Sequence, residues 1–306
     1  MLGRWDRFLG PNFAYAGARV SPRRVAPVAR EGSLGSPRPE MRAAFVRTPS
    51  REGRGREKVA DGIKNLPSLP KVVLFDMDDT IFDHALTCRD ALARLRQETP
   101  VLRGRSSTEL WVEYGRLLER VQPDIASGVL TIDQARTERF VRLAAFCGGS
   151  ASDAEAQEWS RTYRAYYQSL RRLVPGARRL LEQLHGRTVL GVVTNNQVAE
   201  QEEKVAHFGL DGLIDILVVS EGVGVSKPDP RIFSLALDRA GAEPGEAVMI
   251  GDSWENDVRG ARGAGIPAVW FNRFGRRLPE PLCIPQVTSF RAPRRVVTVL
   301  SGAPKP

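Results

Sequence analysis

Short apolar runs alternate with helical patterns along most of the chain after residue 70. Five continuous runs, rich in Val and Ile, occupy residues 72–75, 189–193, 216–219, 247–250 and 268–271. Such unbroken runs are typical of strands covered on both faces. Helical patterns lie between them; one, residues 230–240, starts with Pro230 and is followed by Gly241, as helix starts and ends often are. The pattern predicts an α/β fold, a doubly wound parallel sheet with helices on both faces.

The interval between the first and second runs has no strand pattern and carries four amphipathic helical patterns instead. One of them places five apolar residues on a single face: Leu110, Tyr114, Leu117, Leu118 and Val121. The interval predicts a helical domain over residues 84–173, inserted into a core of residues 70–83 and 174–300. Its aromatic residues, including Trp111 and Phe146, could line a pocket, but an aromatic stripe on a helix more often packs in a core.

The amino-terminal segment differs from the rest in composition. Residues 1–66 hold 14 Lys and Arg against 6 Asp and Glu, a net charge of +8 out of the chain's +9. The segment is rich in Pro, Gly and Arg, and such sequence cannot bury enough apolar surface to offset the entropy lost on ordering. It is therefore predicted to be disordered. Binding of nucleic acid by this basic tail is the alternative, although a charged run is more often only solvated.

Several classes of protein are excluded by what the sequence lacks. No apolar run approaches the ~18 residues needed to cross a bilayer, and no apolar segment typical of a secretory signal follows the start. The three cysteines, Cys88, Cys147 and Cys283, are far apart and form no Cys-x-x-Cys pair. A zinc module or a disulfide scaffold is not expected. These features favour a cytoplasmic protein with no membrane partner.

Residues suited to chemistry follow four of the five predicted strands. In chain order they are Asp76 and Asp78, Thr194 and Asn195, Lys227, and Asp252 and Asp257. In an open parallel sheet, ligands bind beyond the carboxyl ends of the strands, so these side chains are expected to meet at one edge. Each segment alone is common, since Thr-Asn turns and Gly-Asp helix caps are frequent. All four together, in order, are hard to obtain by chance.

This set of residues resembles the motifs of the haloacid dehalogenase-like hydrolases over residues 70–300. The first motif is Asp76-x-Asp78-x-Thr80, the second is Thr194, the third is Lys227, and the fourth starts at Gly251-Asp252. The insertion resembles the helical cap of one large branch of that family. The resemblance implies the sheet order 5-4-1-2-3.

Within the capped branch, the sequence looks most like pyrimidine 5′-nucleotidases and N-acylneuraminate-9-phosphatase. That likeness is carried by Ile81-Phe82-Asp83, by the second strand end and by the segment from Ser220 to Pro228. It implies a small phosphomonoester substrate, a nucleotide or a sugar phosphate, without choosing between them.

The resemblance assigns two carboxylates to catalysis. Asp76 is ionised at neutral pH and would attack phosphorus to form an aspartyl-phosphate. Asp78 would protonate the leaving alkoxide and later take a proton from the attacking water. The namesake dehalogenases attack carbon and, by resemblance, lack the second acid and the metal, so Asp78 favours phosphate chemistry.

The remaining residues would hold a metal and the phosphate. Oxygen ligands from Asp76, the main-chain carbonyl of Asp78, and Asp252 favour Mg²⁺. Three groups are expected to bind phosphate or cancel its charge: Thr194, the main chain of Asn195, and Lys227. Asp257 is expected to orient Lys227 or a metal-bound water rather than to ligate the metal.

The sequence therefore predicts an Mg²⁺-dependent phosphatase, with two alternatives left open. A phosphosugar mutase of the same family would share every motif and return the phosphoryl group to its substrate. A non-catalytic protein could instead keep the fold and bind nucleic acid through residues 1–66. The intact set of acidic residues and Lys227 speaks against the second alternative.

Overall fold

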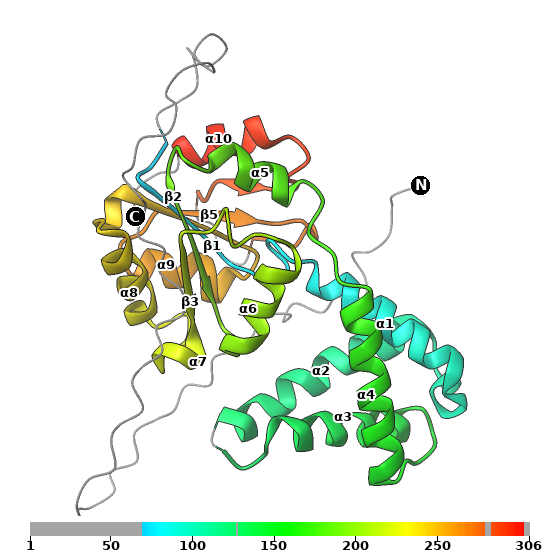
Figure 1. The fold of residues 1–306 in the computed structure, drawn as a ribbon. Coiled ribbons are helices and arrows are strands. Elements are labelled where there is room, and N and C mark those ends of the chain that lie inside the picture. The colour runs from blue at the N-terminus through cyan, green and yellow to red at the C-terminus, as the bar shows by residue number, and fades with distance from the viewer. Residues whose placement is uncertain (1–68, 127, 279–282, 303–306) are drawn as a thin grey trace, which may run out of the picture.

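The protein is described by a computed structural model that covers residues 69–126, 128–278 and 283–302. The predictions for residues 1–66 therefore lie outside the described residues. Six parallel strands form one sheet in the order β3-β2-β1-β4-β5-β6 (Figure 1). Their bounds are β1 Val72–Phe75, β2 Val189–Thr194, β3 Ile216–Val219, β4 Ala247–Gly251, β5 Ala268–Phe271 and β6 Gln286–Val287. The order implied by the family resemblance is confirmed for the first five strands, and β6 extends the sheet beyond β5.

Helices cover both faces of this sheet, as the continuous apolar runs predicted. Because side chains alternate along a strand, Val73 and Phe75 of β1 point into one apolar core and Val72 and Leu74 into the other. One face is covered by α5 Ala177–Leu184, α6 Val198–His207 and α10 Pro293–Ser301, and the other by α8 Pro230–Ala240, the π-helix η3 Trp254–Arg259 and α9 Gly260–Gly263. The fold is a doubly wound α/β sheet.

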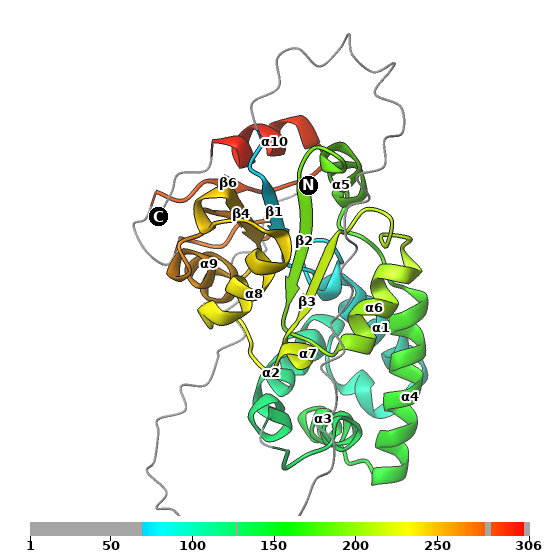
Figure 2. The ribbon, with the colours of Figure 1, turned by 60° about the vertical axis from the view of Figure 1, so that its left-hand side comes forward.

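Four further helices lie between β1 and β2 and stand away from the sheet (Figures 1 and 2). They are α1 His84–Glu98, α2 Ser107–Ala126, α3 Ile132–Phe146 and α4 Asp153–Ser169, with the 3-10 turn η1 Pro100–Gly104 after α1. Capping boxes at Thr131 and Ser152 begin α3 and α4. The rings of Tyr114, Phe140 and Tyr163 pack within 5.1–5.8 Å of one another, centroid to centroid, in the centre of this insertion. These three residues form a core, as the favoured interpretation expected, whereas Trp111 lines the cavity described below.

Two connecting segments join the helical insertion to the core, and backbone hydrogen bonds link them to each other. The amide of Asp83 donates to the carbonyl of Arg172 at 2.9 Å, and the amide of Val174 donates to the carbonyl of Ile81 at 2.8 Å. Phe82 and Leu173 form an antiparallel bridge between these two bonds. The insertion thus leaves and rejoins the core through one paired connection.

Two further short helices complete the described core. Helix α7 Ser220–Val223 follows β3, and the 3-10 turn η2 Pro244–Glu246 precedes β4. Among the residues that the structure covers, no helix combines the length and apolar character needed to cross a bilayer.

Candidate active site

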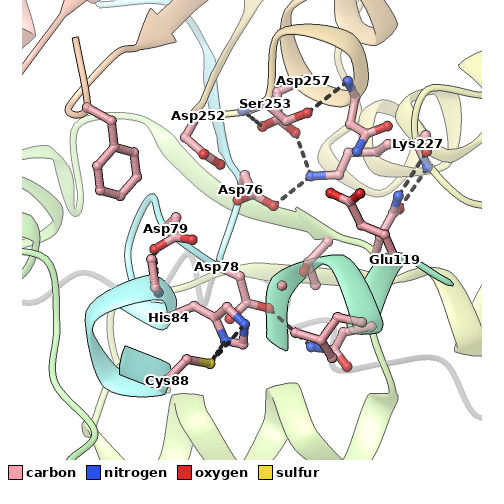
Figure 3. Close-up of a pocket in the computed structure, with 18 of the residues that line it drawn as sticks. Asp76, Asp78, Asp79, His84, Cys88, Glu119, Lys227, Asp252, Ser253 and Asp257 are labelled. Atoms are coloured by element: carbon pink, nitrogen blue, oxygen red, sulfur yellow. Dashed lines mark hydrogen bonds and ion pairs between the residues drawn. The ribbon is translucent and has the colours of Figure 1, made fainter. Parts of the chain in front are cut away.

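Lys227 lies at the centre of the site, between two buried carboxylates (Figure 3). Its Nζ is 2.6 Å from Asp76 Oδ1 and 2.6 Å from Asp257 Oδ1. All three residues are almost fully buried, with 4, 7 and 1% of Lys227, Asp76 and Asp257 exposed. Burial disfavours the Lys227 ammonium, but the two carboxylates outweigh it and raise the pKa of this group above its usual value. The Lys227 side chain therefore stays protonated next to Asp76.

The segment that carries Lys227 is held by the end of β2. The Asn195 side chain accepts from the Lys227 amide and donates to the Lys227 carbonyl, both at 2.8 Å. On the far side, Asp229 caps α8 by accepting from the Arg231 amide, and Pro230 occupies the first turn of that helix. The Asn195 amide side chain is used for this support, so a phosphate contact by Asn195 would have to come from its main chain.

Asp78 lines the same cavity, and its carboxylate accepts hydrogen bonds from side chains that follow β2. Lys204 Nζ lies 2.6 Å from Asp78 Oδ1, while the amides of Gln201 and Asn196 donate to Oδ2 at 3.0 and 3.1 Å. Burial alone would raise the pKa of the Asp78 carboxyl, but the Lys204 ammonium, His84 and the Gln201 amide hold it well below its usual value.

A hydrogen bond links the loop after β1 to the loop after β4. The amide of Asp252 donates to the buried Thr80 hydroxyl at 3.1 Å, and the amide of Ser253 donates to Asp257 Oδ2 at 2.9 Å. Gly251 is required at the end of β4 because a Cβ there would overlap the Asp257 carboxylate. This close approach explains the glycine of the fourth motif.

Asp76, Asp252 and Asp257 each offer a carboxylate oxygen within 4.8 Å of the others, a spacing that could hold a metal ion. Burial raises the pKa of Asp76 to about 7 against the effect of Lys227, and burial together with the charge of Asp79 raises that of Asp252 well above its usual value. Such buried, mutually repelling carboxylates suit a divalent cation. Both oxygens of Asp257 are already bonded, to Lys227 and to the Ser253 amide. The residues present fit a cation held by Asp76 and Asp252.

A cavity of about 150 Å³ joins these groups to the helical insertion. All seven residues predicted from the strand ends line it: Asp76, Asp78, Thr194, Asn195, Lys227, Asp252 and Asp257. The insertion contributes residues of α1 and α2, among them His84, Trp111, Leu118 and Glu119. In Figure 3, Glu119 and His84 lie on either side of Asp76 and Asp78. The insertion therefore walls off the side of the cavity opposite the sheet.

Sequence reasoning missed several residues at this site. Gln201 and Lys204 of α6 contact Asp78, and Arg276, after β5, lies with its Nη1 3.6 Å from Asp252 Oδ2. A polar pair on a helix is usually solvated, so the spacing of Gln201 and Lys204 gave no warning of their burial. Their position seven and ten residues after Thr194, on the helix that starts at the same sheet edge, was the available signal.

The family comparison agrees with this geometry. Residues 70–265 match the model of the haloacid dehalogenase-like hydrolases. The pyrimidine 5′-nucleotidase YjjG of Escherichia coli (strain K12) is 28% identical over 209 residues, covering 68% of this chain and 88% of the relative. A glyceraldehyde 3-phosphate phosphatase of Pyrococcus furiosus is 29% identical over 207 residues, covering 67% of this chain and 82% of the relative.

A solved structure supports the fold. The HAD-hydrolase YfnB of Bacillus subtilis, crystallised with magnesium, aligns with a TM-score of 0.60 at 24% identity and covers 75% of this chain and 99% of its own. The family model spans more than half of the chain. This chain is accordingly an enzyme that belongs to the haloacid dehalogenase-like hydrolases and carries a helical cap.

Proposed function

We propose that this hydrolase is an Mg²⁺-dependent phosphatase of small phosphomonoesters, either nucleotides or sugar phosphates. The observation that carries the proposal is the pair of carboxylates on one cavity, Asp76 and Asp78, each with a lysine ammonium 2.6 Å away. One carboxylate can attack phosphorus while the other handles protons. The relatives named as a nucleotidase and as a phosphatase support the same reaction.

The proposed reaction has two displacements at phosphorus. An oxygen of Asp76 attacks phosphorus and the bond from phosphorus to the alcohol oxygen breaks. Because Lys204 holds the pKa of Asp78 low in the free protein, Asp78 would take up a proton from the monoanionic form of the bound phosphomonoester and pass it to that oxygen. Asp78 then takes a proton from a water whose oxygen attacks the aspartyl-phosphate, which releases inorganic phosphate and restores Asp76. Lys227 offsets negative charge on Asp76 and on the transferred group throughout. Thr194 and the main chain of Asn195 would bind phosphate oxygens.

Three oxygen donors would hold the metal: Asp76, Asp252 and the main-chain carbonyl of Asp78. Bound there, Mg²⁺ would supply charge neutralisation between the nucleophile and the phosphate and would favour the ionised form of Asp76. Asp257 would orient Lys227, because its Oδ1 lies 2.6 Å from Nζ. The magnesium crystallised with the Bacillus relative supports this choice of metal.

A small leaving group fits the cavity best. Its volume is about 150 Å³, and its cap side combines apolar Trp111 and Leu118 with the carboxylate of Glu119. A ring or chain of modest size with hydroxyl or amine donors would match this lining. We propose that residues 84–173 act as the cap that selects the leaving group and that residues 70–83 and 174–300 form the catalytic core.

The presence of Asp78 disfavours cleavage of a carbon–halogen bond. In that reaction a halide leaves and needs no proton, so a second carboxylate acting as an acid would have no role. A phosphosugar mutase remains the second candidate within enzymes, because the same two carboxylates would serve it. The two differ in whether water or a second substrate hydroxyl attacks the aspartyl-phosphate.

The test is a screen of phosphate release over nucleotides, sugar phosphates and phosphoglycolate with Mg²⁺, following product identity in parallel. We expect stoichiometric inorganic phosphate from a preferred monoester, with Asp76→Asn folded but inactive because an amide nitrogen cannot replace the attacking oxygen. Isomerised sugar phosphate with negligible free phosphate would assign the enzyme to the mutases. Full activity in excess chelator would contradict the proposed dependence on Mg²⁺.

A further inference from the structure

Helix α6 buries two polar side chains on the face that meets the active site. Gln201 and Lys204 lie one turn apart, with 0 and 1% of their surface exposed. A lysine is almost never this deeply buried unless its charge is paired, because losing water from the ammonium is costly. The pair therefore needs partners inside the protein, and its contacts show what it serves.

Both residues bind the same carboxylate. Lys204 Nζ lies 2.6 Å from Asp78 Oδ1, and Gln201 Nε2 donates to Asp78 Oδ2 at 3.0 Å. The same Gln201 amide lies 3.1 Å from the Thr194 hydroxyl. Gln201 thus links the proposed acid–base residue to the proposed phosphate-binding residue.

The lysine is also held from its other side. Its Nζ lies 4.8 Å from the ring centroid of Phe82, a distance typical of a cation–π contact. Phe82 itself is fully buried at the start of the connection to the cap. With the ring on one side and the carboxylate on the other, the Lys204 side chain has little freedom to reorient.

These contacts leave Asp78 one place for a proton. A carboxylate offers about four lone-pair positions, two on each oxygen. The amides of Gln201 and Asn196 take both positions on Oδ2, and Lys204 takes one on Oδ1. With the contacts made by the described part of the chain counted, the position that remains is on Oδ1. A proton exchanged with a leaving group would therefore have a single, fixed location.

We propose that Lys204 and Gln201 are positioning residues that fix the Asp78 carboxylate so that Oδ1 faces the leaving-group oxygen. The inference rests on the proposed phosphatase function, in which Asp78 protonates the alkoxide. A merely structural ion pair would stabilise the fold without affecting one class of leaving group more than another. That difference makes the proposal testable.

The test compares two substrates in Lys204→Met. An alkyl phosphomonoester releases a strongly basic alkoxide that needs the acid, whereas p-nitrophenyl phosphate releases a weakly basic phenolate that does not. The ratio kcat/KM reports the steps up to departure of the alcohol. We expect kcat/KM to fall about 100-fold for the alkyl substrate and less than about 5-fold for the aryl one. Glu202→Gln, an exposed change on the same helix, should alter neither.

Gln201→Leu is the second variant, for use if Lys204→Met fails to fold. It removes an uncharged donor and leaves Asp78 paired with Lys204. It should show the same substrate dependence with a smaller loss, about 3- to 10-fold for the alkyl substrate. Equal losses for both substrates in a folded variant, or no loss, would overturn the positioning role. Failure of the wild type to hydrolyse either substrate would instead contradict the proposed function.

Discussion

Gly251 shows how a single hydrogen atom in place of a side chain determines the arrangement of the site. Its α-carbon approaches the Asp257 carboxylate so closely that a methyl group has no room. Asp257 in turn holds Lys227 and the Ser253 amide. The geometry around Asp76, the proposed nucleophile, therefore depends on a glycine that is not among the described residues lining the cavity.

Gly251→Ala should displace Asp257 and with it Lys227. We expect a loss of about 1–3 kcal/mol in the free energy of unfolding, as for other overpacked sites, and a fall in kcat of at least about 10-fold. Urea unfolding and steady-state kinetics would measure both. Gly263→Ala is the matched control, since a Cβ there meets nothing within 4 Å. Equal behaviour of the two variants would contradict the role given to Gly251.

Asp252 gives a second prediction at this scale, on metal binding. Asp252→Asn removes one carboxylate from the proposed metal site. Binding can be followed as the rise in unfolding temperature on adding Mg²⁺, and the Mg²⁺ concentration that gives half of this rise should increase at least about 10-fold. Without metal, the variant should be at least as stable as the wild type, because one repelling charge close to Asp76 and Asp79 is gone. An unchanged Mg²⁺ dependence would remove Asp252 from the ligands.

At the scale of elements, α2 lines the cavity into which Asp76 and Asp78 point. Trp111 and Leu118 of α2 line the cavity, whereas Trp159 of α4 packs against the cap core and does not. The two tryptophans are both half-buried, which makes them a matched pair.

Trp111→Ala should lower kcat/KM about 10-fold for the preferred monoester and change it less for a substrate with a minimal leaving group, because Trp111 lines the side of the cavity proposed to hold the leaving group. Trp159→Ala should cost stability without altering the preference between substrates. Kinetics with both substrates would check this. Identical specificity profiles for the two variants would show that α2 does not select the leaving group.

How far the sequence predicts these elements depends on burial. The central strands were predictable because both faces are covered, so apolar residues occupy every position. Strand β6, only Gln286–Val287 with Gln286 exposed, has no such run and was not predicted. The burial of Lys204 also escaped prediction, since a charged residue is expected to face water until the facing carboxylate is known. Thr194 and Lys227 were placed correctly at the cavity because the ends of parallel strands meet at one edge.

At the scale of the whole molecule, charge is distributed unevenly. Residues 1–66 carry +8 of the net charge of +9, whereas the described residues that line the cavity all lie after residue 70. We therefore expect catalysis and any electrostatic attraction to nucleic acid to reside in different parts of the chain.

Removing residues 1–66 should leave kcat/KM and the unfolding temperature unchanged, because the contacts that form the site lie after residue 70. Any salt-sensitive binding of the full chain to duplex DNA should vanish in the shortened protein. Titrations at two salt concentrations, alongside kinetics, would measure this. Lost turnover would assign the tail a part in catalysis, and DNA binding that persists would locate that activity in the core.

The paired connection between cap and sheet also bears on how the chain folds. Strands β1 and β2 are neighbours at the centre of the sheet, with Val72 opposite Val189, although the whole cap separates them in sequence. Closing so long a loop costs entropy and slows folding. Bonds such as that from the Val174 amide to the Ile81 carbonyl bring the ends of the insertion together once the cap has formed, so that only residues 76–81 and 174–188 remain as loop between the two strands. Substitutions that weaken the cap should therefore delay assembly of the central sheet even where the final stability changes little.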